Sequence, residues 1–212
     1  MTRRRLLVTG FGPFPTVPRN PSAAAARAVA SSRRLKLLEV EAEALILTTA
    51  YATLPLELDP ALTATPDAVL MIGVAARSRP IRIEWRATAR RSTLFPDVAG
   101  ERATRPADPS VARRTRLAPV KARNAVARQG LPVRLSRDAG RYLCNAAYFR
   151  ALGQGSATLF VHIPLSRSLP ALRSRDGATR RKPRLGREDR LAAALVEVAL
   201  LLLREKRLQP AR

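Results

Sequence analysis

The sequence predicts a single domain of the α/β class, in which a parallel or mixed sheet is covered by helices on both faces. The chain has 212 residues, which suits one α/β domain with a substantial core and is short for two. Its hydrophobic content of 46% is ordinary for a globular protein. Short apolar runs alternate with stretches of helical periodicity, and no internal repeat or linker divides the chain.

The N-terminal part of the chain predicts a strand, a turn and a helix. Residues 6–9 are an apolar run, as expected for a buried first strand, and residues 10–15 are rich in glycine and proline. A helix is predicted to start at Asn20 and to end near Ser31. Asn20 suits the N-cap, and Pro21 suits the first helical position because that position needs no N–H donor.

The rest of the chain repeats the alternation of strand and helix patterns. Strands are predicted at 38–48, 67–74, 81–85, 131–135 and 158–163, and helices at 139–152 and 187–207. In such folds the functional residues gather beyond the carboxyl ends of strands. The residues that fall at or near predicted strand ends are Gly10, Gly73, Glu84 and His162.

Two segments have no clear period and are predicted to be loops. Residues 90–114 are polar and rich in arginine and proline, and residues 166–186 are basic and of low complexity. Long segments of this kind usually lie on the surface of a domain. The expected organisation is therefore one domain over residues 1–212 with two long loops.

The formal net charge of +23 raises the question of a polyanionic partner. Neutralisation of phosphates by basic side chains dominates the affinity of proteins for nucleic acid. Here, however, the basic residues are almost all arginine and are scattered along the whole chain, and aromatic residues make up only 4%. Nucleic acid is therefore not expected as the physiological partner.

The apolar segments and the cysteine content bear on location. The apolar run near the N-terminus is too short for a signal peptide, and the longest apolar stretch, 191–203, is interrupted by Glu197. A single cysteine cannot form a disulfide within the chain. The protein is expected to be soluble and cytoplasmic, with no membrane partner.

Cys144 and His162 are the only cysteine and the only histidine of the chain. This combination is typical of a thiol nucleophile and its base. Gly140 can provide a sharp entry to the predicted helix, and Ser136 or Asp138 can provide its cap, which would place the cysteine near the first turn. The helix N-terminus would then lower the pKa of the thiol.

These residues also have structural interpretations, which the pattern alone leaves open. A lone cysteine in an apolar helix is commonly a small core residue, and a lone histidine at a strand end is commonly structural. Glu84 lies near Arg82 and Arg86 and could be half of a salt bridge. Asp97 follows Pro96 and suits a turn or a cap as well as a site.

The residue types argue against a metal or a nucleotide cofactor. One histidine and one cysteine cannot build an ordinary zinc site. The segment 10–12 has two glycines but lacks the third glycine of a dinucleotide-binding loop. No metal and no cofactor are expected.

Several short segments, in order along the chain, form a specific pattern that includes the sole cysteine and the sole histidine. The strongest segments are Val8-Thr9-Gly10-Phe11-Gly12-Pro13-Phe14 followed by Asn20-Pro21-Ser22, then Ala139-Gly140-Arg141-Tyr142-Leu143-Cys144-Asn145, and Phe160-Val161-His162-Ile163-Pro164. With these segments the chain resembles pyroglutamyl peptidase I, a family of cysteine peptidases that remove an N-terminal pyroglutamate.

The resemblance implies a catalytic triad of Cys144, His162 and Glu84 acting on an amide bond. Cys144 would attack the pyroglutamyl carbonyl, His162 would act as base and then as acid, and Glu84 would orient the imidazole. It also implies an α/β/α sandwich with a mixed, mostly parallel central sheet, of the phosphorylase/hydrolase-like type. The family is often assembled as a homo-oligomer, a tetramer or a dimer.

The resemblance further implies a small apolar pocket for the lactam ring. An uncharged ring fits an uncharged pocket, since a buried unpaired charge would be costly. Asn20 matches the family's asparagine beside the catalytic region. The implied pocket residues are Phe11, Phe14, Thr48, Phe95, Tyr142 and Leu143.

The chain departs from the family in one region. Its Ala-Arg-Ser at 76–78 stands where the family has Gly-Gly-Arg, and Leu94 aligns with a family arginine associated with the site. Arg90 or Arg91 could substitute for that arginine, with Asp97 as a further supporting residue. These departures concern substrate specificity and oxyanion stabilisation more than the cysteine and histidine pair.

Three functions are compatible with the sequence. The first is a cysteine omega-peptidase that cleaves pyroglutamyl amide bonds of N-terminally pyroglutamylated peptides without a cofactor. The second is a divergent cysteine amidase on the same scaffold, acting on another small lactam or an N-acyl substrate. The third is a non-catalytic protein that binds RNA or another polyanion through its basic surface.

Overall fold

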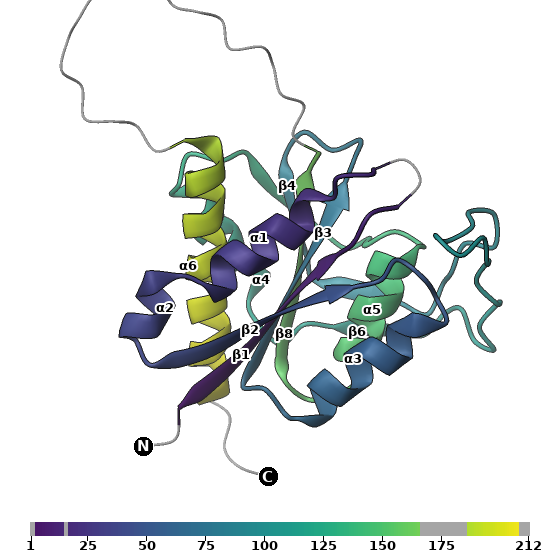
Figure 1. Ribbon diagram of the computed structural model, residues 1–212, viewed down its shortest axis with the longest axis horizontal. Helices are drawn as coiled ribbons and strands as arrows, with labels where there is room; N and C mark the ends of the chain where they lie inside the picture. The colour runs from purple at the N-terminus through teal and green to yellow at the C-terminus, as the bar shows by residue number, and fades with distance from the viewer. Residues whose placement is uncertain (1–2, 15–16, 166–185, 208–212) are drawn as a thin grey trace, which may run out of the picture.

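The computed structural model of the chain describes residues 3–14, 17–165 and 186–207. Within these ranges, six strands form a sheet in the order β2-β1-β3-β8-β4-β7, and a separate two-stranded sheet pairs β5 with β6 (Figure 1). The strands are β1 (Arg4–Phe11), β2 (Val40–Leu47), β3 (Ala68–Ala75), β4 (Ile81–Glu84), β5 (Arg86–Thr88), β6 (Ala112–Arg114), β7 (Val133–Ser136) and β8 (Ala157–Pro164).

Helices cover both faces of the six-stranded sheet, and each face has its own apolar cluster. Along β1, Leu6 and Val8 pack in the cluster under α1, α2, α4 and α6, whereas Leu7 and Phe11 pack in the cluster under α3 and α5. This alternation follows from the two-residue period of a strand. The helices are α1 (Pro21–Ala30), α2 (Arg33–Leu37), α3 (Thr53–Thr63), α4 (Pro119–Ala127), α5 (Leu143–Ala151) and α6 (Arg187–Arg207).

The structure confirms the α/β class and the mixed, mostly parallel sheet. Strands β2, β1, β3 and β8 are parallel to one another, whereas β4 is antiparallel to β8 and parallel to β7. Glu84 is the last residue of β4, as predicted, but β4 runs in the opposite direction to β8. Glu84 lies opposite Phe160, and Arg82 is the residue directly opposite His162.

The predicted strands and the predicted N-terminal helix are present with slightly different bounds. The side chain of Asn20 accepts a hydrogen bond from the Ser22 N–H, and Pro21 begins α1, as predicted. Three helices, α2, α3 and α4, lie in stretches for which the pattern makes no prediction. The predicted loop 90–114 is wrong for its last three residues, which form β6.

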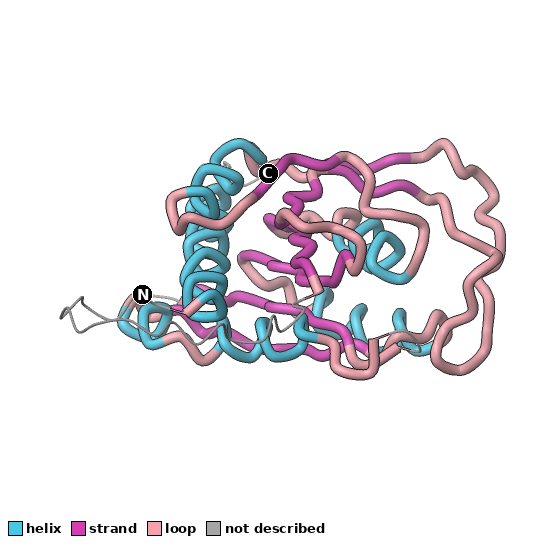
Figure 2. The backbone as a smooth tube through the Cα atoms, turned by 90° about the horizontal axis from the view of Figure 1, so that it is seen from above, coloured by secondary structure: helices cyan, strands magenta, loops and turns pink. Residues whose placement is uncertain are grey.

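The segment between β5 and β6 carries no helix or strand and extends to one side of the molecule, where Figure 2 shows it as a long loop. The second predicted loop, 166–186, lies outside the described residues except for its last position. Helix α6 follows it, as predicted, and has two acidic residues in its first turn, which suit the positive end of the helix dipole. Among the helices in the described part of the chain, none is long and apolar enough to cross a membrane.

Candidate active site

A cavity of about 410 Å³ lies where the ends of β1, β3 and β8 meet the start of α5. It brings together residues that are far apart in the sequence, including the sole cysteine and the sole histidine. The sequence-predicted residues that line it are Phe11, Phe14, Asn20, Phe95, Tyr142, Leu143, Cys144 and His162.

Asn20 lines the cavity and also holds the turn that carries two of its phenylalanines. Its Oδ1 accepts hydrogen bonds from the N–H and the hydroxyl of Ser22, and its Nδ2 donates to the carbonyl of Gly12 at 2.9 Å. The Ser22 hydroxyl in turn accepts from the N–H of Phe11. The amide of Asn20 is therefore engaged in fixing the connection between β1 and α1.

Cys144 is the second residue of α5, so it lies in the first turn of the helix. The helix is shorter at its start than predicted, because Gly140 has a φ of +86° and Tyr142, the N-cap, is extended. The prediction that Ser136 or Asp138 caps this helix is wrong. The Asp138 carboxylate accepts instead from the N–H of Gly140, two residues before the N-cap.

Gly73 on β3 leaves the space that the cysteine sulfur occupies. A Cβ at this position would lie 3.0 Å from Cys144 Sγ and 2.7 Å from Cζ of Phe160. The Phe160 ring is fully buried and packs on the imidazole of His162, with ring centroids 4.7 Å apart. The absence of a side chain at position 73 thus lets the cysteine and the histidine face the same cavity.

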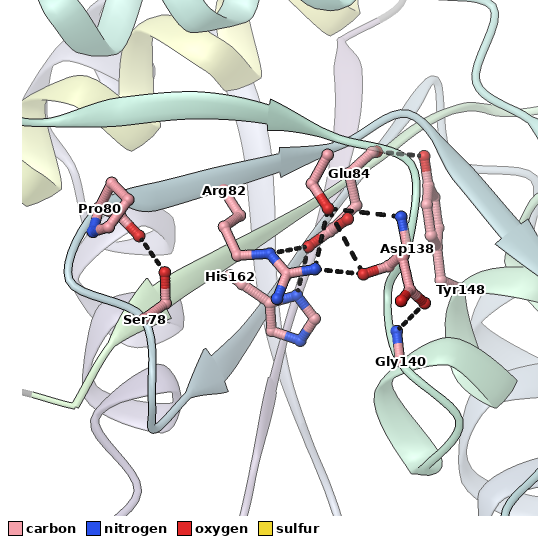
Figure 3. Close-up of polar contacts among 9 residues, drawn as sticks. Ser78, Pro80, Arg82, Glu84, Asp138, Gly140, Tyr148 and His162 are labelled. Atoms are coloured by element: carbon pink, nitrogen blue, oxygen red, sulfur yellow. Dashed lines mark hydrogen bonds and ion pairs between the residues drawn. The ribbon is translucent and has the colours of Figure 1, made fainter.

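His162 and Glu84 form a direct pair. The imidazole Nδ1 lies 2.9 Å from Oε1 of Glu84, whose side chain is fully buried (Figure 3). A carboxylate can only accept, so Nδ1 carries the proton of this hydrogen bond, and in the neutral imidazole Nε2 is then the free nitrogen. The same Glu84 oxygen lies 2.9 Å from Nε of Arg82, which also lines the cavity.

Two buried residues of α5 hold the strand that carries Glu84 and the segment after it, and neither was predicted to act at the site. The hydroxyl of Tyr148 donates to the Glu84 carbonyl at 2.8 Å. The amide of Asn145 accepts from the Thr88 N–H and donates to the carbonyls of Thr88 and Arg90. Asn145 belongs to the segment that carries the family resemblance, but its partner could not be read from the sequence.

Asp97 organises a loop and does not line the cavity. Its carboxylate, 2% exposed, accepts from the backbone N–H groups of Tyr51, Ala99 and Glu101. The Tyr142 hydroxyl donates to the carbonyl of the preceding Pro96 at 2.8 Å. Asp97 therefore supports the loop that carries Phe95.

Three predicted site residues, Thr48, Arg90 and Arg91, lie elsewhere than expected. Thr48 is exposed, and the threonine that lines the cavity is its neighbour Thr49. Arg90 and Arg91 have exposed side chains and are absent from the cavity lining, and Leu94 is 75% exposed. The arginines that do line the cavity are Arg77 and Arg82, both in the stretch between β3 and the end of β4.

The expected net lowering of the thiol pKa at the helix start is wrong for the free protein. Burial, together with the negative charge of Glu84, raises the pKa of Cys144 to about 12, although the residue's own backbone N–H acts in the opposite direction. The thiol is therefore protonated at neutral pH and needs a base to remove its proton.

Alkylation of the sole cysteine should reveal this raised pKa. The rate constant for reaction with iodoacetamide is expected to rise about tenfold per pH unit from roughly pH 7 to pH 10, because the thiolate is the reacting form. Small-molecule thiols, with a pKa of about 8.5, level off within this range and serve as the comparison. A plateau below about pH 8 would contradict the raised pKa.

The fold and the site together define a class of protein: an α/β protein with a cysteine and a histidine at one cavity and a carboxylate buried behind the histidine, as in cysteine hydrolases. The family model described as pyroglutamyl peptidase matches residues 4–198. The chain therefore belongs to the pyroglutamyl peptidase family, which confirms the resemblance seen in the sequence.

Individual relatives agree with this assignment. The pyrrolidone-carboxylate peptidase of Vibrio vulnificus is 32% identical over 176 residues, which cover 76% of this chain and 79% of that protein. The pyrrolidone-carboxylate peptidase of Deinococcus radiodurans is 32% identical over 75% of this chain and 77% of its own length.

Solved structures show the same fold. Pyroglutamyl peptidase I from Bacillus amyloliquefaciens superposes with a TM-score of 0.75 at 22% identity, covering 95% of this chain and 96% of that one. Pyrrolidone carboxyl peptidase from Thermus thermophilus superposes with a TM-score of 0.71 at 26% identity, covering 94% and 98%.

Proposed function

We propose that the protein hydrolyses the amide bond that follows an N-terminal pyroglutamyl residue of a peptide. The observation that carries the proposal is the placement of Cys144 and His162 on one cavity, with Glu84 buried behind the histidine at 2.9 Å. The substrate class is inferred from the relatives, which are named as pyrrolidone-carboxylate peptidases. The mostly apolar lining of the cavity suits an uncharged lactam ring.

In the proposed mechanism, His162 acts first as a base. Its Nε2 takes the thiol proton as Cys144 Sγ forms a bond to the pyroglutamyl carbonyl carbon. Glu84 holds the ring through Nδ1 and stabilises the imidazolium that forms. The unpaired N–H groups at the start of α5 lie beside the sulfur and supply donors for the carbonyl oxygen as it becomes negative.

The tetrahedral intermediate formed by this attack then breaks down. The C–N bond breaks, the imidazolium gives its proton to the departing amine, and the pyroglutamyl group remains on sulfur as a thioester. A water molecule, deprotonated by His162, attacks the thioester carbonyl. The S–C bond breaks, the thiol regains its proton, and free pyroglutamate leaves without the help of a cofactor.

A second candidate is an amidase for another small lactam or N-acyl group. Arg77 lines the same cavity as Cys144, and an arginine favours a substrate that carries a carboxylate. This observation fits a divergent acyl group as well as a pyroglutamyl peptide with a negative charge near the cleaved bond.

A panel of fluorogenic amides separates the two candidates. We expect kcat/KM to be highest for the pyroglutamyl amide and at least about 100-fold lower for the prolyl amide, which lacks the lactam carbonyl, and for an N-acetyl-alanyl amide. A preference for an N-acyl amide would favour the second candidate. No hydrolysis, together with saturable and salt-sensitive RNA binding, would favour a polyanion-binding protein.

The location and assembly of the protein are part of the same proposal. A single cysteine, unable to form a disulfide within the chain, suits a cytoplasmic location. The site described above is built from one copy of the chain, so its hydrolytic activity should persist in a monomer as well as in a dimer or tetramer.

A further inference from the structure

We propose that Arg82 is a positioning residue that neutralises the charge of Glu84 and so keeps His162 uncharged and able to accept the thiol proton. The catalytic consequence rests on the proposed function. The charge relation itself can be tested without any substrate.

The register of the sheet places the three side chains on one face. Arg82 lies directly opposite His162 in the antiparallel pair of β4 and β8, and Glu84 follows two residues later on the same face. The intervening Ile83, like Ile81, packs in the apolar cluster on the other face. The antiparallel pairing of β4 with β8 thus brings an arginine and a glutamate to the same histidine.

An ion pair and two hydrogen bonds hold the guanidinium of Arg82 in place. Its Nε lies 2.9 Å from Oε1 of Glu84, and its Nη2 donates to the carbonyl of Asp138 (Figure 3). Nη2 also donates to the Ser136 hydroxyl at 2.8 Å. The Asp138 carboxylate in turn accepts from the N–H of Gly140, in the loop that leads to Cys144. Arg82 thus links the buried carboxylate to the segment before the nucleophile.

Because Glu84 is buried, its negative charge needs a nearby positive group to stabilise it. The side chain is fully buried, and its second oxygen, Oε2, has no hydrogen-bond partner among the described residues. A buried carboxylate without a counter-charge is costly. Two groups contact it that can be positive: Arg82, which is always charged, and His162, which is charged only when it is protonated.

Without Arg82, Glu84 would draw a proton onto His162. An imidazolium has no free nitrogen and cannot take the proton of Cys144. With Arg82 present, the carboxylate is already paired, so the histidine can stay neutral until the thiol reacts. Arg82 therefore ensures that, before catalysis, the negative charge of Glu84 is balanced by the guanidinium and His162 is neutral.

The other titratable groups around the pair do not replace Arg82. Burial raises the pKa values of the Cys144 thiol and the Tyr148 hydroxyl, so both are neutral near pH 7. Arg77 lines the same cavity, but within the described part of the chain the ion pairs of the carboxylate are those with Arg82 and His162. Asp138 contacts Arg82 through its carbonyl, and its carboxylate faces the Gly140 N–H.

The test follows the NMR signals of the only histidine during a pH titration of the untagged protein. In Arg82→Gln, the midpoint is expected to move to higher pH than in wild type by about one unit, the usual effect of losing a nearby cation. In Arg82→Lys, which keeps the charge, the midpoint should return toward that of wild type. An Arg82→Gln midpoint equal to that of wild type would overturn the proposal.

Two control variants separate charge from structure. Ser136→Ala removes one hydrogen bond of Arg82 but leaves its ion pair, and Arg27→Gln removes an exposed charge on α1; neither should move the midpoint. If Arg82→Gln does not fold, Arg82→Met, which keeps the apolar stem, takes its place. Failure of both neutral variants to fold would show that Arg82 is mainly structural and would overturn the proposal.

A catalytic measurement completes the test. The acid limb of the kcat/KM profile for a pyroglutamyl amide should move to higher pH in Arg82→Gln, in step with the NMR midpoint. A uniform loss of rate at every pH would point to a structural role alone. If the wild-type protein hydrolyses no pyroglutamyl amide, the proposed function fails while the NMR titration still decides the role of Arg82.

Discussion

Glu84→Gln is expected to lower kcat for a pyroglutamyl amide by about 10⁴-fold, with a much smaller change in KM. The neutral amide cannot stabilise the imidazolium, and it can turn its NH₂ group toward Nδ1, which would favour the wrong tautomer of His162. Arg82 would keep its contacts with Ser136 and Asp138, so we expect the variant to fold. Steady-state kinetics and circular dichroism check both expectations.

Glu101→Gln is the matched control for this variant. It makes the same chemical change at an exposed side chain whose loop is held by its backbone N–H. The control should retain the wild-type kcat. A loss of less than about tenfold in Glu84→Gln would show that Glu84 is not the residue that orients the histidine.

Gly73→Ala is expected to reduce both activity and stability. The new methyl group would lie 2.7 Å from the Phe160 ring and 3.0 Å from Cys144 Sγ, and the ring is fully buried. Overpacking of this kind typically costs about 1–3 kcal/mol of unfolding free energy. Because Phe160 packs on His162, its displacement should also lower kcat by about 100-fold, in line with the cost of a small misplacement of reacting groups.

Gly12→Ala provides the comparison for Gly73→Ala. A Cβ at Gly12 would meet only the carbonyl oxygen of Leu47, at 3.6 Å, which is an ordinary contact. Its effect on the free energy of unfolding should be below about 0.5 kcal/mol, measured by urea denaturation. Equal stability and equal activity of Gly73→Ala and wild type would contradict the close packing of the cysteine and Phe160.

Much of the fold could be predicted because the strands are apolar runs with clear limits. The sequence could not predict α3, since Pro55 and Pro60 both fall within it and a proline usually ends a helix. Pro55 lies in the first turn, where its missing N–H costs nothing, and packing of three leucines on the sheet outweighs the lost hydrogen bond at Pro60.

The direction of β4 is a second feature that could not be predicted from the sequence. An apolar pattern identifies a strand but not whether it runs parallel or antiparallel to its neighbours. For this reason the role of Arg82 opposite His162 was not visible. The two sequence-based interpretations of Glu84, a salt bridge with Arg82 and a partner of the histidine, are both present in the structure.

The candidate site could be predicted where residue type alone was decisive, as for the sole cysteine and the sole histidine. The site residues could not be predicted in turns, where a shift of one position changes which side chain points into the cavity. Thr49 and not Thr48 lines the cavity for this reason. The sign of the pKa shift at Cys144 was also missed, because the start of α5 was visible in the sequence but the loss of solvation around the half-buried thiol was not.

The most direct test of the central claim is release of a fluorescent amine from a pyroglutamyl amide by wild type and by Cys144→Ala, each shown to be folded. We expect measurable turnover by wild type and a loss of at least about 10⁴-fold in the variant, since the residue forms the covalent bond. Equal turnover by the two proteins would contradict the assignment of Cys144 as the nucleophile.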